Sequence, residues 1–91
     1  MGALDGIRRL AGLQESGVTT VTVESAGGGK RTYKNVSSLK RRGALGNLYA
    51  ASNRSGAGYT LEVSGDYAWV YALNGRTVFR GFVNPVTLPP A

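Results

Sequence analysis

Aromatic rings that alternate with arginines near the C-terminus are the residues best suited to recognise another molecule. Residues 67–83 read Y-A-W-V-Y-A-L-N-G-R-T-V-F-R-G-F-V, and side chains alternate between the two faces of a strand. One face would therefore carry Tyr67, Trp69, Tyr71, Arg80 and Phe82. Rings on an open sheet stack on nucleic-acid bases, and neighbouring arginines reach phosphates. Two other interpretations stay open: the rings form the hydrophobic core, or they contact another subunit, where Trp, Tyr and Arg are enriched.

Basic residues form a second candidate site. The chain has 11 Lys and Arg against 5 Asp and Glu, a net charge of +6, and no acidic residue lies between Ser25 and Leu61. Such an imbalance attracts polyanions, although a solvated cluster without a partner would look the same. The residues expected to contact phosphates are Lys30, Arg31, Lys34, Lys40, Arg41, Arg42, Arg54 and Arg76.

Catalytic chemistry has little support in the composition. The chain contains neither histidine nor cysteine, and its carboxylates are scattered singly, so we expect no enzyme activity, no metal site and no cofactor. Residues 27–30 read G-G-G-K, but Glu24 stands where a phosphate-binding loop needs its first glycine. A glycine-rich turn beside Lys30 can still present amides to a phosphate, although an ordinary hairpin turn explains it equally well.

The length of 91 residues predicts one domain, which we place at 1–84, followed by an extended, proline-rich tail at 85–91. Apolar runs are far shorter than the ~20 residues of a membrane-spanning helix, and Arg8 and Arg9 interrupt the N-terminal apolar stretch. These features predict a cytoplasmic protein that does not enter a membrane, and the lack of cysteine fits a reducing compartment.

Asn74-Gly75 predicts the turn of the longest hairpin, because this dipeptide favours a two-residue type I′ turn. Such a turn would place Val70 opposite Phe79 and Tyr67 opposite Phe82. The other face of this hairpin carries small and aliphatic side chains, so both faces need covering. We expect one face to pack on a helix and the other to meet a partner.

The remaining elements predict an α+β domain with the order α-β-β-α-β-β-β. Apolar spacing predicts one helix over residues 3–15 and a weaker one over 39–51, capped by Ser37 or Ser38. Residues 18–25 and 30–36 alternate as a hairpin, and residues 59–63 form a further strand. The predicted fold is thus an antiparallel sheet of two hairpins on one or two short helices.

Together these patterns predict a small, non-catalytic, basic nucleic-acid-binding protein that forms homo-oligomers. The alternative is a protein–protein interaction module: a self-associating structural subunit, or a small inhibitor whose basic surface occupies an acidic site or a nucleic-acid-binding site of a partner protein. Standalone basic domains of this size are frequent among phage and mobile-element products, which is an association of size and composition alone.

Overall fold

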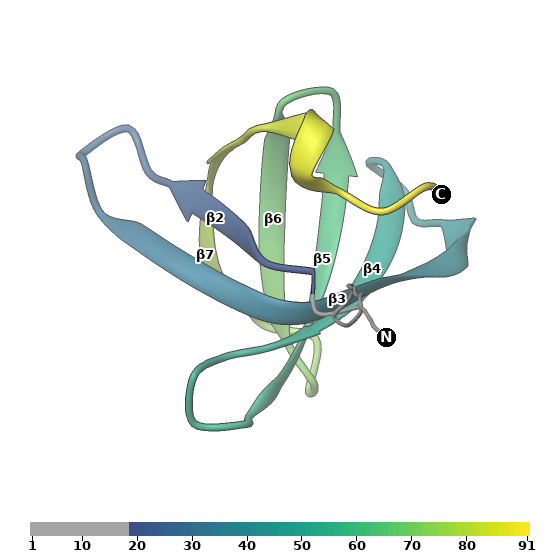
Figure 1. Ribbon diagram of the computed structural model, residues 1–91, viewed down its shortest axis with the longest axis horizontal. Helices are drawn as coiled ribbons and strands as arrows, with labels where there is room; N and C mark the ends of the chain where they lie inside the picture. Colours follow the sequence, from purple (N-terminus) through teal and green to yellow (C-terminus); the bar gives the residue numbers. More distant parts are fainter. Residues whose placement is uncertain (1–18) are drawn as a thin grey trace, which may run out of the picture.

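The computed structural model describes residues 19–91, and these form a closed barrel of antiparallel strands (Figure 1). Each strand pairs with the next one along the chain, and the last strand pairs back with the first. The strands are β2 (Val21–Glu24), β3 (Lys30–Arg42), β4 (Asn47–Ser52), β5 (Gly58–Ser64), β6 (Tyr67–Ala72) and β7 (Thr77–Val83). Closure leaves few unpaired strand edges, which suits a small all-β domain.

The prediction of an α+β fold is wrong, because the described residues contain no α-helix. The predicted helix over 39–51 is instead the end of β3, a loop at 43–46, and β4. Its apolar stripe was narrow and interrupted by Gly43 and Gly46, whereas Tyr49 and Ala51 alternate inward with the period of a strand. The predicted helix over 3–15 lies outside the described residues.

The β6–β7 hairpin has the predicted register over most of its length. Val70 faces Phe79, and Tyr67 faces Phe82. The turn, however, is not type I′. The amide of Gly75 donates to the carbonyl of Ala72 at 2.9 Å, and the amide of Ala72 donates to Arg76 at 2.9 Å. Gly75 has a φ of 89°, so this is a three-residue loop ending in a left-handed glycine bulge.

A second irregularity corrects the register that this bulge shifts. Tyr71 pairs with Thr77, not with Val78, and the ladder changes register between Val70 and Tyr71. The two irregularities compensate each other, so the pairs farther from the turn are those that a two-residue loop would give. The alternation of faces along the hairpin therefore survives the incorrect turn type.

The core of the barrel is mostly aliphatic and includes the buried rings of Tyr33 and Tyr49. The β6–β7 hairpin contributes the face that carries its small side chains. Ala68 and Val70 are fully buried, whereas Phe82, on the opposite face, is 51% exposed. The interpretation of the hairpin's aromatic face as the core is therefore wrong, and so is the expected packing of a helix on the small face. The buried residues are Val21, Val23, Tyr33, Val36, Tyr49, Ala51, Leu61, Val63, Ala68, Val70 and Val83.

Strand β3 wraps around the barrel and connects two separate regions of its surface (Figure 1). It is 13 residues long, and its pairing with β4 breaks twice, between Lys34 and Ser37 and between Ser38 and Arg42. Asn35 and Lys40, at these breaks, have positive φ values of 54° and 58°. Such bulges bend a strand strongly, so the two ends of β3 lie in different surroundings.

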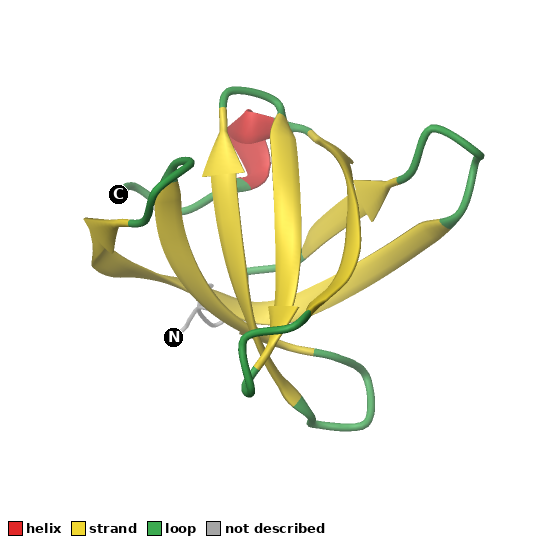
Figure 2. Cartoon of the chain, turned by 180° about the vertical axis from the view of Figure 1, so that it is seen from behind, coloured by secondary structure: helices red, strands yellow, loops and turns green. Residues whose placement is uncertain are grey.

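The C-terminal segment begins as a single 3₁₀ turn rather than as a fully extended tail. This turn, η2 (Pro85–Thr87), lies at one end of the barrel and is red in Figure 2. The side chain of Asn84 accepts a hydrogen bond from the amide of Val86 at 3.1 Å, which caps the turn. Leu88 then packs against the core.

Candidate functional site

An open cleft of about 960 Å³ lies between the first half of β3 and the loop that joins β4 to β5. Four of the predicted phosphate-binding cations line it, and no carboxylate does. We call this site the cationic cleft. Its lining residues are Thr20, Lys30, Arg31, Thr32, Tyr33, Lys34, Asn53, Arg54, Ser55 and Tyr59.

Two tyrosines supply the aromatic part of the cleft. The rings of Tyr33 and Tyr59 meet edge to face, with centroids 5.5 Å apart and planes at 69°. Burial raises the pKa of the Tyr33 hydroxyl above its ordinary value of 10.0, although the charge and hydrogen bond of Arg31 oppose that shift. This hydroxyl therefore stays protonated at neutral pH, and the walls of the cleft carry no negative charge from it.

Arg31 is an exposed residue whose guanidinium lies over the half-buried ring of Phe79. It follows the inward alternation of Tyr33, and its guanidinium carbon lies 4.7 Å from the centroid of the Phe79 ring. This cation–π contact limits the positions that the guanidinium can adopt. Less side-chain entropy is therefore lost when an anion binds it than for a freely moving arginine.

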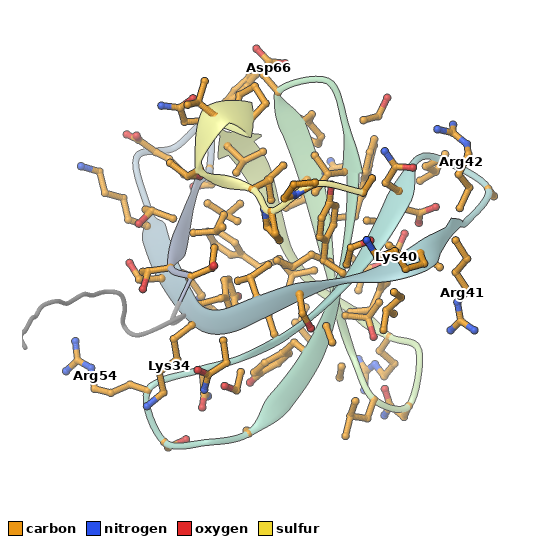
Figure 3. All side chains as sticks on the ribbon, turned by 45° about the vertical axis from the view of Figure 1, so that its right-hand side comes forward. Lys34, Lys40, Arg41, Arg42, Arg54 and Asp66 are labelled. Atoms are coloured by element: carbon orange, nitrogen blue, oxygen red, sulfur yellow. The ribbon has the colours of Figure 1, made fainter. Side chains whose placement is uncertain are left out.

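The loop between β4 and β5 holds Arg54 at the other side of the cleft. Asn53 organises this loop: its side-chain oxygen accepts hydrogen bonds from the Ser55 hydroxyl at 2.8 Å and the Ala57 amide at 2.9 Å. Gly56 completes the turn with a φ of 92°. In Figure 3, Arg54 and Lys34 project from neighbouring elements into the same region.

Lys40, Arg41 and Arg42 lie at the other end of β3, beside the loop 43–46 (Figure 3). We call them the distal cluster. None of the three lines the cleft, so the basic segment 30–42 does not form one continuous patch. Arg76 is also separate, because it follows the β6–β7 turn, where its amide donates to the Asn74 side chain at 3.0 Å.

A buried carboxylate lies next to the distal cluster. Glu62 is only 5% exposed, and one of its oxygens accepts hydrogen bonds from the amides of Leu45 at 2.7 Å and Gly46 at 3.2 Å. The other oxygen accepts from the Tyr71 hydroxyl at 2.7 Å. Glu62 thus fastens the loop 43–46 over the outer surface of β5.

The electrostatics of Glu62 favour its charged form. Burial alone would raise the pKa of its carboxyl, but the three hydrogen bonds and the charge of Arg42 outweigh that effect and lower the pKa below its ordinary value of 4.5. Burial and the bond to this carboxylate raise the pKa of the Tyr71 hydroxyl. The negative charge of Glu62 therefore offsets part of the positive charge of the distal cluster.

The sequence interpretation missed Glu62 because nothing in its local pattern marks it. Alternation places it outward, between the buried Leu61 and Val63. Its burial comes from a loop that lies close only because two residues have no side chain. A Cβ at Gly46 would collide with the Val63 carbonyl, and one at Gly43 would collide with the Glu62 carboxylate.

The predicted stacking residues lie on the outer surface of β6 and β7, away from the core. The ring centroids of Tyr67 and Trp69 are 5.0 Å apart, and those of Tyr67 and Phe82 are 5.2 Å apart. Arg80 pairs with Trp69 across the ladder. We call Tyr67, Trp69, Val78, Arg80 and Phe82 the aromatic face. Tyr71 is set apart by its bond to Glu62.

Acidic residues lie along the border of the aromatic face and separate this face from the cationic cleft. Glu24 pairs with Phe82, and Asp66 directly precedes Tyr67. Lys30 is a cleft residue in the same row of the sheet as Phe82, but Glu24 lies between the two residues. The predicted stacking rings and phosphate contacts therefore do not form one surface.

Within residues 19–91, no group of three or more His, Cys, Asp or Glu side chains is arranged to hold a metal ion. No helix in this part of the chain has the length and hydrophobicity needed to cross a membrane. Compared with protein-family models, with curated proteins and with solved structures, the chain matches none of them.

Proposed function

We propose that this protein binds nucleic acid without catalysis, and that the cationic cleft holds the phosphate backbone. The observation that carries the proposal is the lining of the cleft: Lys30, Arg31, Lys34 and Arg54 face a common space with no carboxylate. Cations around a concave, low-dielectric wall focus the electric field and attract polyanions more strongly than the same cations on a flat surface.

The side chains that line the cationic cleft contribute to binding in different ways. Lys30, Lys34 and Arg54 are exposed and reach phosphates as mobile charges, whereas Arg31 is oriented by Phe79 and offers a fixed guanidinium fork. The half-buried ring of Tyr59 offers a stacking contact for an unpaired base. Binding of this kind depends mainly on phosphates, so affinity falls with salt and varies little with sequence.

The distal cluster has a smaller role in this proposal. Its three cations are exposed, but the carboxylate of Glu62 lies near them and lowers the local potential. A long strand of nucleic acid would contact it after the cleft is occupied. A cytoplasmic location, suggested by the absence of cysteine, belongs to the same proposal.

The experiment compares two variants with equal net charge. Lys30→Ala/Lys34→Ala/Arg54→Ala removes three cations from the cleft, and Lys40→Ala/Arg41→Ala/Arg42→Ala removes three from the distal cluster. Fluorescence anisotropy with single- and double-stranded oligonucleotides at about 50 and about 200 mM salt measures both. We expect the cleft variant to lose at least about tenfold in affinity and to reduce the salt slope by about 2–3, against a smaller loss for the control.

Two results would contradict the proposal. If the wild-type protein binds no oligonucleotide at low salt, nucleic acid is not its ligand. Equal losses in the two variants would mean that net charge, and not the cleft, attracts the polyanion.

A second candidate function is protein–protein interaction, favoured by the aromatic face. Phe82 is 51% exposed and contacts the ring of Tyr67, which in turn contacts Trp69. Val78, which is 39% exposed, lies two positions before Arg80 on β7. In this alternative the cationic cleft binds an acidic surface of another protein. Binding of acidic proteins but not of oligonucleotides would favour it.

A further inference from the structure

The start of β3 has an open strand edge inside the cationic cleft. Residues 30–33 pair with β2 on one side, but the pairing of β3 with β4 extends only as far as Lys34 and Ser52. Beyond Ser52 the chain diverges from β3 into the loop 53–57, and the cleft lies between this loop and the edge (Figure 1). Among residues 19–91 no strand pairs with this edge, so its backbone amides and carbonyls are available to a ligand.

The alternation of the ladder identifies which backbone groups face the cleft. The amide of Ser25 donates to the carbonyl of Gly29 at 2.7 Å, and an antiparallel ladder bonds every second pair beyond such a bond. The backbone of Thr32 therefore points away from β2 and towards the cleft, while its hydroxyl is bonded to that of Thr22 at 3.0 Å. Thr32 thus presents an adjacent donor and acceptor, which suits the edge of an unpaired base.

The ring of Tyr59 is held in place in the same cleft. It meets the buried ring of Tyr33 edge to face, and its hydroxyl accepts a hydrogen bond from the side-chain amide of Asn53 at 3.4 Å. Its partners on both neighbouring strands are alanines, Ala51 and Ala72, so neither position covers the ring with a large side chain. A half-buried ring that is already oriented stacks on a base with little loss of side-chain entropy.

The dimensions of the cleft exclude a double helix. Its volume of about 960 Å³ equals that of a cube about 10 Å on a side, whereas the major groove of a B-form duplex alone is about 12 Å wide. A duplex would therefore touch only the exposed cations Lys30, Lys34 and Arg54, and its paired bases would not reach Tyr59. A single strand can turn its bases into the cleft while its phosphates stay beside these cations.

We infer that the cationic cleft selects single-stranded nucleic acid, with one base stacked on Tyr59 and the edge of that base bonded to the backbone of Thr32. This inference rests on the proposed function and specifies its substrate class. The cations hold the phosphates on either side of the base, so tight binding requires both phosphates and an unpaired base. Charge alone gives the opposite preference, because a duplex carries more phosphates per unit length than a single strand.

A comparison of three ligands with the wild-type protein tests the selectivity. The ligands are a labelled DNA strand of about 12 nucleotides that cannot pair with itself, its duplex, and an abasic strand with the same phosphates and no bases. Fluorescence anisotropy at about 100 mM salt measures the three affinities. We expect the single strand to bind at least about tenfold more tightly than the duplex, and the abasic strand to lose about 5- to 150-fold, which is the contribution of one stacked base.

Two tyrosine variants locate the stacked base. Tyr59→Leu removes the ring from the cleft and keeps an apolar side chain against the core. Tyr67→Leu is the matched control, because Tyr67 is a half-buried ring of the aromatic face, outside the cleft. With circular dichroism to show that both are folded, Tyr59→Leu should weaken single-strand binding about fivefold or more and leave duplex binding unchanged, whereas Tyr67→Leu should change neither.

Failure of this inference can be separated from failure of the proposed function. If wild type binds the duplex or the abasic strand as tightly as the intact single strand, selection of a single strand is overturned, and the cleft remains a site for phosphates. A loss with Tyr67→Leu but not with Tyr59→Leu places the stacked base on the aromatic face and also overturns the inference. If wild type binds none of the three ligands, the proposed function fails as well. The ligand comparison needs only wild-type protein, so the test does not depend on the stability of the variants.

Discussion

The two ends of β3 carry the same kind of residues in very different surroundings. At its start, Lys30, Arg31 and Lys34 line a cleft with two tyrosines and no carboxylate. At its end, Lys40, Arg41 and Arg42 lie beside a buried carboxylate that comes from β5. The carboxylate nearest to the first group, Glu24, pairs with Lys30 but lies outside the cleft, whereas Glu62 is buried beside the distal cluster. The positive potential is therefore weakened more at the distal end of β3.

This difference shows that a basic segment is not yet a binding site. The bulges at Asn35 and Lys40 bend β3 and separate its two groups of cations. The cleft gathers its fourth cation, Arg54, from a loop twelve residues beyond the end of β3. Concavity and a lining without carboxylates distinguish the first end, whereas the second end lies beside a buried carboxylate of β5 that fastens the loop 43–46.

The largest effect should come from removing the carboxylate at the distal end. Glu62→Ala leaves two amides and the Tyr71 hydroxyl without their acceptor, and we expect it to lower the free energy of unfolding by about 3 kcal/mol. Urea denaturation measures this loss. Glu24→Ala is the matched control, because Glu24 is an exposed carboxylate and should change stability by less than about 0.5 kcal/mol. Similar values for the two variants would refute the structural role of Glu62.

Lowering the pH should remove the contribution of Glu62 to stability at the distal end of β3. The folded state lowers the pKa of Glu62 below 4.5, so its contribution to stability is present above that pH and is lost as the pH falls through the folded pKa. Thermal melting between pH 7 and pH 3 should show this loss below about pH 4.5 in wild type. Glu62→Gln, which cannot titrate, should show a smaller loss over the same range. An identical acid transition in both proteins would assign the effect to other carboxylates.

The smallest effect concerns the contact that orients one cleft cation. Arg31→Ala removes the guanidinium from the Phe79 ring and should cost about 0.5–1 kcal/mol of stability. Arg41→Ala, an exposed residue of the distal cluster, should cost almost nothing. Equal denaturation midpoints would mean that Arg31 is not held by the ring, and the comparison between an oriented and a free cation would fail.

Several features of this protein follow from the amino-acid sequence alone. The alternation along residues 67–83 and the Asn74-Gly75 pair predict the longest hairpin, its two faces and most of its register. These features depend on neighbouring residues and on the period of a strand, so the local sequence is enough to predict them. The type of turn was not predictable in the same way, because two compensating bulges give the same distant pairs as a two-residue loop.

Other features were decided by tertiary structure. Residues 39–51 have a weak helical stripe and a weak strand pattern, and pairing with β3 and β5 on both sides makes β4 a strand. Both faces of the β6–β7 hairpin are largely apolar, so periodicity does not indicate which one is inside. Closure of the barrel decides it: the buried rings of Tyr33 and Tyr49 come from other strands, and the β6–β7 hairpin contributes Ala68 and Val70 to the interior beside them. A Cβ at Gly81 would collide with the backbone of Glu24, so this face can only be the closely packed one.

The candidate sites show the same division. Composition alone predicts that the chain attracts anions and lacks histidine and cysteine chemistry, because charge and residue types are counted without a fold. Which cations act together depends on distances across strands, and so does the burial of Glu62. Residues that are far apart along the chain meet through backbone pairing, the bending of β3 and the close approach of Gly46 to β5, and none of these is encoded in a single local stretch.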